Sequence, residues 1–253
     1  MEDSKIAWTD YTFNPWIGCT RVSEACRNCY AESENARYKW NGGVWGPGTL
    51  RKITSEDNWR NPIRWDRKAA TEGKRAKVFC AGLADVFDLE APDGAREHLW
   101  EMILETPHLD WLLLTKRPEN FDAMLPGNWA RYHNVWLGVS CESRKWFSRV
   151  DILRLTPAVV RFLSCEPLLE DISDINLQGI DWVICGRESG SHAREFKIEW
   201  ARNLRNACTG KHFFMKQLGS FVQTEVAKGE KKDVHGTNPA HFPTDLRVQT
   251  WPR

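Results

Sequence analysis

Short apolar runs without polar alternation recur along the chain, and such runs are typical of strands buried on both faces of a parallel sheet. Between most of these runs, apolar residues return at helical spacing, as they do over 94–106 and 197–208. Strands that alternate with helices predict βαβ units with right-handed crossovers. The six apolar runs cover 77–82, 110–115, 134–140, 159–164, 181–186 and 211–216.

A further strand in "TFNPWIGC" would give six or seven β/α units, fewer than the eight of a complete barrel. We therefore expect an α/β fold with an incomplete (β/α) barrel over 1–218. A doubly wound open sheet is the alternative, because strand order is not contained in the sequence. Segment 39–76, rich in Gly, Trp and basic residues, is interpreted as an insertion, and 219–253 as a C-terminal extension.

Composition narrows the class of protein. The formal net charge of +1 over 253 residues argues against a strong non-specific grip on nucleic acid, which needs a net basic field. No stretch approaches the roughly 20 apolar residues of a membrane helix, and "MEDSKIAWTD" lacks the apolar segment of a signal peptide. We expect a cytoplasmic protein without a membrane partner. Its eight cysteines then indicate metal, cluster, catalysis or burial rather than disulfides.

Three of these cysteines lie in one loop over 18–32, "GCTRVSEACRNCYAE", at Cys19, Cys26 and Cys29. A structural zinc site normally uses four protein ligands, and no fourth lies nearby. A Cys-x2-Cys redox pair and simple burial are the alternatives, but a polar loop with a third cysteine suits neither well. Three thiolates suit an iron–sulfur cluster in which one iron keeps a vertex for an outside molecule.

Polar residues follow successive predicted strands at their carboxyl ends, where parallel β/α folds build their sites. Loops are polar in any case, but each of these residues is the first or second polar position after an apolar run. They predict a functional site at the end of the barrel where the strands have their carboxyl ends, which we call the mouth. The positions are Asp85, Thr115, Lys116, Arg117, Ser140, Glu142, Ser164, Glu166, Arg187, Glu188, Ser189, Lys216 and Gln217. The candidate site residues among them are Lys116, Arg117, Ser140, Glu142, Glu166 and Glu188.

The chain resembles a phage and bacterial three-cysteine family of largely uncharacterised function, related to radical S-adenosylmethionine enzymes. The landmarks are "KIAWTDYTFNPWIGCTRVSEACRNCYAE", "LLLTKRPENF", "NVWLGVSCE", "VVRFLSCEPLL", "IDWVICGRESG" and "FFMKQLG". The resemblance implies a partial barrel of TIM-barrel type, a [4Fe–4S] cluster on Cys19, Cys26 and Cys29, and S-adenosylmethionine at the mouth. Residues Ser140, Glu142, Glu166 and Glu188 are then candidates for the ribose and amino group of this cofactor, and Lys116 and Arg117 for its carboxylate or the substrate.

Two features depart from the commonest pattern of those enzymes. The spacing here is Cys-x6-Cys-x2-Cys, whereas Cys-x3-Cys-x2-Cys is commonest. A glycine-rich motif for the amino group of the cofactor is not clear, and "CAGLAD" is its best candidate. The longer spacing between Cys19 and Cys26 is compatible with a cluster. The expectation of radical chemistry then rests on the family resemblance.

A second set of cysteines falls at or just past predicted strand ends, at Cys80, Cys141, Cys165 and Cys185. Four thiolates across the mouth would suit a second iron–sulfur cluster or zinc. The alternative is that each serves as a small buried hydrophobe. Strand alternation favours this in part, because cysteines that alternate with mouth-facing polar residues point toward the helices.

The partners are an unidentified substrate, with a nucleic acid as one candidate, and a protein partner or electron donor. Tryptophans among basic residues over 59–77 suit single-strand stacking, and a solvated surface is the alternative. Three functions remain open. They are a radical S-adenosylmethionine enzyme, a metal-stabilised nucleic-acid or partner-binding protein, and an iron–sulfur electron-transfer or sensor protein.

Overall fold

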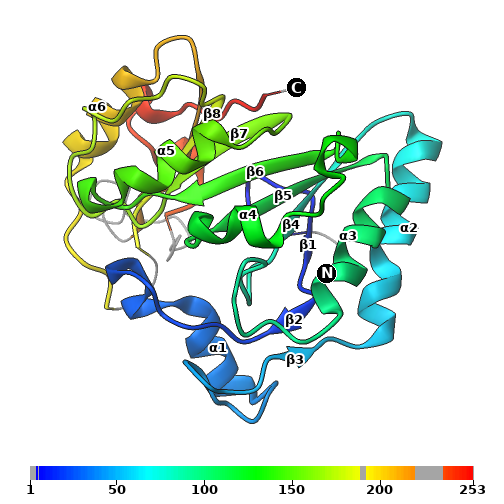
Figure 1. Ribbon diagram of the computed structural model, residues 1–253. Helices are drawn as coiled ribbons and strands as arrows, with labels where there is room; N and C mark the ends of the chain where they lie inside the picture. The colour runs from blue at the N-terminus through cyan, green and yellow to red at the C-terminus, as the bar shows by residue number, and fades with distance from the viewer. Residues whose placement is uncertain (1–3, 5, 189–191, 220–235, 253) are drawn as a thin grey trace.

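The computed structural model describes residues 4, 6–188, 192–219 and 236–252. Seven parallel strands form one curled sheet in which spatial order follows chain order (Figure 1). They are β1 (Tyr11–Phe13), β4 (Ala76–Cys80), β5 (Leu109–Thr115), β6 (Val135–Ser140), β7 (Val160–Cys165), β8 (Trp182–Gly186) and β9 (His212–Gln217). A doubly wound sheet would reverse its order at one point. The predicted incomplete barrel is therefore confirmed.

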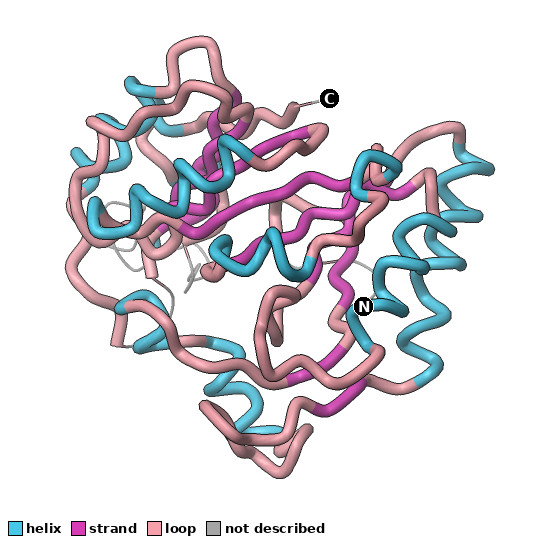
Figure 2. Tube along the Cα trace, viewed as in Figure 1, coloured by secondary structure: helices cyan, strands magenta, loops and turns pink. Residues whose placement is uncertain are grey.

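Helices cover the convex face of this sheet (Figure 2). They are α2 (Glu56–Glu72), α3 (Ala95–Glu105), α4 (Phe121–Met124), α5 (Phe147–Leu155) and α6 (Ile198–Ala207). Short 3-10 turns are η1 (Glu24–Asn28), η2 (Pro118–Asn120), η3 (Trp129–Arg131), η4 (Arg144–Trp146), η6 (Pro239–His241) and η7 (Thr244–Leu246). Strands β2 (Trp16–Ile17) and β3 (Lys52–Ile53) pair antiparallel outside the main sheet. Helix α1 (Tyr30–Tyr38) follows the cysteine loop and lies outside the helix layer, on the side of β2 and β3 (Figure 1). No described helix is both long and apolar enough to cross a membrane.

Strand alternation divides the core into two clusters, because successive side chains point to opposite faces. One cluster contains helix residues such as Leu99 and Leu204, and so lies between sheet and helices. The other contains strand aromatics such as Trp136 and Phe162 and fills the concave face. Gly138 belongs to that face, where a Cβ would lie 2.4 Å from the Phe162 ring. The barrel interior is thus packed with aromatic rings.

Segment 39–76, interpreted above as an insertion, contains helix α2. Ser55 caps it by accepting a hydrogen bond from the backbone N–H of Asn58, and the helix packs against the sheet through buried Trp59 and Trp65. These two rings are therefore core residues and not an exposed stacking surface. In the predicted C-terminal extension, residues 248–250 run antiparallel to β9, where Met215 N–H donates to Val248 O over 2.8 Å and Thr250 N–H donates to Phe213 O over 3.0 Å. Residues 220–235 lie outside the described part.

Candidate functional site

The cysteine loop crosses the carboxyl ends of the first strands. Gly18 begins it with φ of +124°, a conformation that glycine adopts without strain. Its N–H donates to Leu83 O over 3.1 Å, just beyond the end of β4. At the far end of the loop, the Tyr30 hydroxyl donates to Gly82 O over 2.7 Å. Both ends of the loop are thus fastened to the chain that leaves β4.

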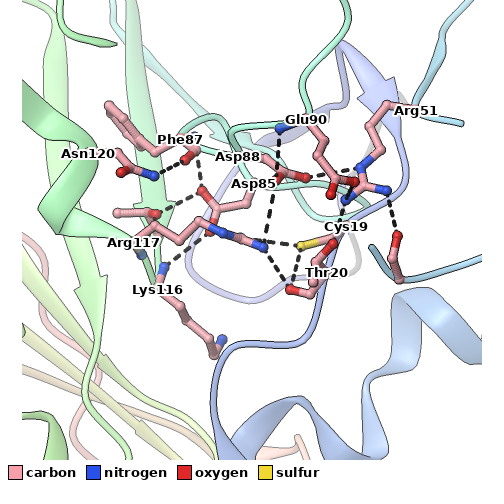
Figure 3. Close-up of polar contacts among 12 residues, drawn as sticks. Cys19, Thr20, Arg51, Asp85, Phe87, Asp88, Glu90, Lys116, Arg117 and Asn120 are labelled. Carbon is pink, nitrogen blue, oxygen red and sulfur yellow. Dashed lines mark hydrogen bonds and ion pairs between the residues drawn. The ribbon is translucent and has the colours of Figure 1, made fainter. Parts of the chain in front are cut away.

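Arg117, which follows β5, holds the first cysteine. Its Nη1 donates to Cys19 Sγ over 3.5 Å, and its Nη2 donates to Thr20 O over 2.7 Å (Figure 3). Asp85 fixes the guanidinium by accepting from Nη1 over 2.9 Å. Arg117 was a candidate for a cofactor carboxylate, and here its guanidinium is occupied with the cysteine loop.

A buried ion network extends behind this contact. Arg51 pairs with Asp88, Nε to Oδ2 at 3.0 Å, and its Nη2 donates to Thr20 Oγ1 over 2.6 Å (Figure 3). The side chains of Arg51, Asp85, Asp88 and Arg117 are each at most 8% exposed. Neither Arg51 nor Asp88 was singled out from the sequence, because nothing local links segment 39–76 to the residues after β4.

Glu188, which follows β8, holds the other end of the cysteine loop. Its Oε2 accepts from Asn28 Nδ2 over 3.0 Å and from Arg194 N–H and Nε, each over 2.9 Å. Asn28 lies between Cys26 and Cys29. Burial raises the pKa of Glu188, but the hydrogen bonds from Arg194 and Asn28 lower it more, so that its pKa lies below the usual range. Glu188 is thus an anchor for the loop, a role the sequence did not reveal.

The three loop cysteines differ from the other five, because each is partly exposed while the rest are buried. Burial together with Asp85 raises the pKa of Cys19 to about 12, against the opposing effect of Arg117. Burial also raises the pKa of Cys29, which Lys116 opposes. Among the described residues, no group of three or more His, Cys, Asp or Glu is arranged to hold a metal ion. The donor set, three reachable thiols on one anchored loop, nevertheless fits an iron–sulfur cluster.

Beside the loop, polar side chains line the carboxyl end of the concave face. Lys116 Nζ donates to Ser140 Oγ over 3.1 Å, and Lys116 has no carboxylate within ion-pair distance among the described residues. Ser140 and Ser164 are register partners on β6 and β7. Ser164 Oγ donates to Glu166 Oε2 over 3.2 Å, and Lys216 Nζ lies 3.0 Å from Glu166 Oε1. The structure brings these predicted mouth residues into one row.

Glu142 lies fully buried beyond β6. Its Oε2 accepts from Arg149 Nη1 over 3.2 Å, while its Oε1 is buried without a hydrogen-bond partner in the described part of the protein. A buried carboxylate oxygen without a partner is unusual, since such atoms nearly always find a donor. Glu142 therefore carries one oxygen that is both buried and without a partner among the described residues.

The second set of cysteines lies elsewhere. Cys80, Cys141, Cys165 and Cys185 have no exposed surface and pack in the cluster between sheet and helices. Cys165 and Cys185 are register partners, and burial raises the pKa of both thiols well above the usual range. The structure thus places these thiols among apolar side chains and does not bring them to the mouth.

Comparison with known proteins gives the family and the fold. The chain belongs to the family described as "Protein of unknown function (DUF5131)", whose model matches residues 3–239. Among curated proteins, none matches. Solved structures of spore photoproduct lyase match with 83% of this chain covered, and this chain spans only 64% of their length.

Three of these structures illustrate the likeness. A cysteine-to-serine mutant matches at 13% identity with a TM-score of 0.52. A double mutant with bound AdoMet and dinucleoside spore photoproduct matches at 12% and 0.51, and a complex with dinucleoside spore photoproduct at 12% and 0.52. At this identity the likeness shows a shared half-barrel fold, as the radical S-adenosylmethionine resemblance implied.

Proposed function

For a member of the DUF5131 family with the half-barrel of spore photoproduct lyase, we propose an iron–sulfur enzyme of radical S-adenosylmethionine type. Cys19, Cys26 and Cys29 would hold a [4Fe–4S] cluster. When bound, the cluster and S-adenosylmethionine supply reductive cleavage of the sulfonium bond and a carbon radical that abstracts hydrogen from the substrate. The observation that carries the proposal is that three partly exposed thiols share one loop, fastened over the carboxyl end of the sheet.

The protein contributes placement of the loop. Arg117 holds Cys19 and the carbonyl of Thr20, and Glu188 holds Asn28 between the other two cysteines. The segment that carries all three thiols is therefore fixed to β5 and β8 before any cluster is bound. These anchors restrict the path of the loop over the strand ends, while the three thiols themselves are not gathered as a ligand set in the described part of the protein.

The polar side chains of the mouth, beside the cysteine loop, suit an amino-acid head group, which carries one negative and one positive charge. Lys116 offers an ammonium without a carboxylate partner among the described residues, next to Ser140. Glu166 offers an acceptor for an ammonium or for ribose hydroxyls, whereas Glu142, fully buried beside Arg149, is not assigned a cofactor contact. Lys116 is thus assigned to the carboxylate of S-adenosylmethionine and Glu166 to its amino group or ribose.

The test is anaerobic purification with assays for iron and sulfide, followed by EPR of the reduced protein with and without S-adenosylmethionine. We expect brown protein, a signal that changes on addition of S-adenosylmethionine, and 5′-deoxyadenosine after reduction. Cys26→Ala is expected to lose the iron, while Cys208→Ala, which alters a buried cysteine at the end of α6, keeps it.

Colourless protein without iron, or unchanged iron in Cys26→Ala, contradicts the proposal. A cluster whose spectrum ignores S-adenosylmethionine favours the electron-transfer or sensor alternative. Zinc in place of iron favours a metal-stabilised binding protein.

For the substrate we propose a nucleic acid, since matched structures of spore photoproduct lyase contain a dinucleoside spore photoproduct.

A further inference from the structure

Two aromatic rings form an exposed stack at the end of helix α1. Tyr38 and Trp40 lie with their ring centroids 5.2 Å apart and their planes 22° from parallel. Tyr38 is 53% exposed, and Trp40 is half-buried. Most other tryptophans of the chain pack in the core, so rings that stack at the surface are unusual here. We call Arg37, Tyr38, Lys39, Trp40 and Lys52 the α1 platform.

The α1 platform is held in shape by the turn beneath it. Lys39 caps α1 in the left-handed conformation, with φ of 55°, and its N–H donates to Asn35 O over 2.8 Å. Buried Asn35 also donates from Nδ2 to Val44 O over 2.9 Å. Lys52 Nζ donates to Trp40 O over 2.8 Å. The two rings are therefore presented by a braced turn.

The three cations of the α1 platform have no neutralising carboxylate among the described residues. The Arg37 guanidinium lies 5.1 Å from the Tyr38 ring centroid, and Lys39 and Lys52 are exposed. Across the described residues, none of these three cations has a carboxylate within ion-pair distance. Glu34, on the same helix, makes no ion pair with Arg37. Three such charges beside exposed rings match a polyanion that also carries flat, stackable groups.

Helix α2 lacks these properties, although its sequence looked more suited to nucleic acid. Arg60 pairs with Glu56, and Arg64 with Asp57. Its Trp59 is buried and stacks on His98 at 4.2 Å. Two of the four cations of α2 are thus paired with carboxylates, and its tryptophan rings are buried.

We propose that the α1 platform binds single-stranded nucleic acid, with a base stacked against the Tyr38–Trp40 pair and phosphates at Arg37, Lys39 and Lys52. Helix α1 begins directly after Cys29, and its length places Tyr38 about 12 Å from the cysteine loop. At roughly 3.4 Å per stacked nucleotide, a strand of about four nucleotides would connect the two. The platform deepens the proposed function by naming a surface for its substrate class, but strand binding itself requires no cluster.

The experiment measures fluorescence anisotropy of labelled dT12 and rU12 with the full chain at several salt concentrations. We expect Tyr38→Leu to weaken binding about tenfold and Tyr38→Phe to leave it unchanged, because a ring suffices for stacking. Arg37→Ala is expected to lower the slope of log affinity against log salt by about one. The matched control is Arg60→Ala with Arg64→Ala, which removes two cations of α2.

Each outcome decides the proposal. Binding that Tyr38→Leu leaves intact, equal binding of a blunt duplex, or no binding of either oligonucleotide overturns it. A loss of binding in the α2 control equal to that in Arg37→Ala also overturns it, because the charge effect would then be non-specific. Cys26→Ala, which is expected to lack the cluster, should still bind the strand. Failure of strand binding and failure of the radical chemistry are therefore distinguishable.

Discussion

Arg117 donates a hydrogen bond to the sulfur of Cys19, a residue that precedes it by 98 positions in the chain. The same guanidinium pairs with buried Asp85 and donates to the backbone of Thr20. One side chain thus links a buried carboxylate to the first proposed cluster ligand. Hydrogen bonds to cluster sulfurs and their orienting partners tune both affinity and potential.

Replacing Arg117 tests this link. Arg117→Ala leaves Asp85 buried without its main partner, which typically costs about 3–5 kcal/mol, so we expect a clearly lower Tm. Arg117→Lys keeps a charge but cannot bridge Asp85, Cys19 and Thr20 at once, and we expect it to fold and retain less iron after anaerobic reconstitution. Thermal melts and iron-to-protein ratios measure both effects. Exposed Arg64→Ala is the control, and full iron loading of Arg117→Lys contradicts the role.

The lowered pKa of Glu188 predicts that its anchoring of the cysteine loop depends on pH. Its folded pKa is lowered, so its stabilisation is fully present above the unfolded pKa of about 4.3 and is lost as pH falls through the folded value. Glu188→Gln is expected to cost about 1.5–3 kcal/mol at pH 7. The Tm difference from the parent should be constant above about pH 5 and shrink as the pH falls below that value. Glu199→Gln, at an exposed pair with Arg202, is the control, and a pH-independent difference for Glu188→Gln contradicts the anchor.

The tight packing around Gly138 predicts that a larger side chain at this position destabilises the barrel. A Cβ there would lie 2.4 Å from the Phe162 ring, so Gly138→Ala must displace a buried aromatic side chain. Overpacking of this kind typically costs about 1–3 kcal/mol, which urea unfolding measures. At Gly127 a Cβ would meet nothing within 4 Å, so Gly127→Ala is the matched control. Equal stability of the two variants would show that the concave face is loosely packed.

Substitution of a buried cysteine and of a loop cysteine should affect the metal content of the protein differently. If Cys165 serves as a small apolar side chain, Cys165→Ala leaves iron and zinc content unchanged and costs on the order of 1 kcal/mol. Cys29→Ala is expected to lose iron with little effect on the unfolding of the apo protein. Metal analysis, carried out together with urea unfolding, distinguishes a packing role from a metal-binding role. A stoichiometric metal lost in Cys165→Ala would instead support a second site.

Hydrophobic patterning predicted the barrel well because each strand carries its own signal. The six apolar runs coincide within about two residues with strands β4 to β9. The helix over 197–208 appears as α6 for the same reason, with Ala201 and Leu204 on its buried side. Patterning was less informative over 39–76, where aromatic and basic residues alternate. There, burial of Trp59 depends on contact with Phe13 and His98 from other elements.

The sequence by itself determined the parallel sheet, the polar strand ends and the single loop that carries three thiols, because these depend on spacing and residue type over short distances. Only the tertiary structure decided what the polar strand ends do. Arg117 and Glu188 fasten the cysteine loop, whereas Lys116 and Glu166 remain beside it in the mouth. Contacts such as that between Asn28 and Glu188, 160 positions apart, arise when the sheet curls and brings separate strand ends to one edge.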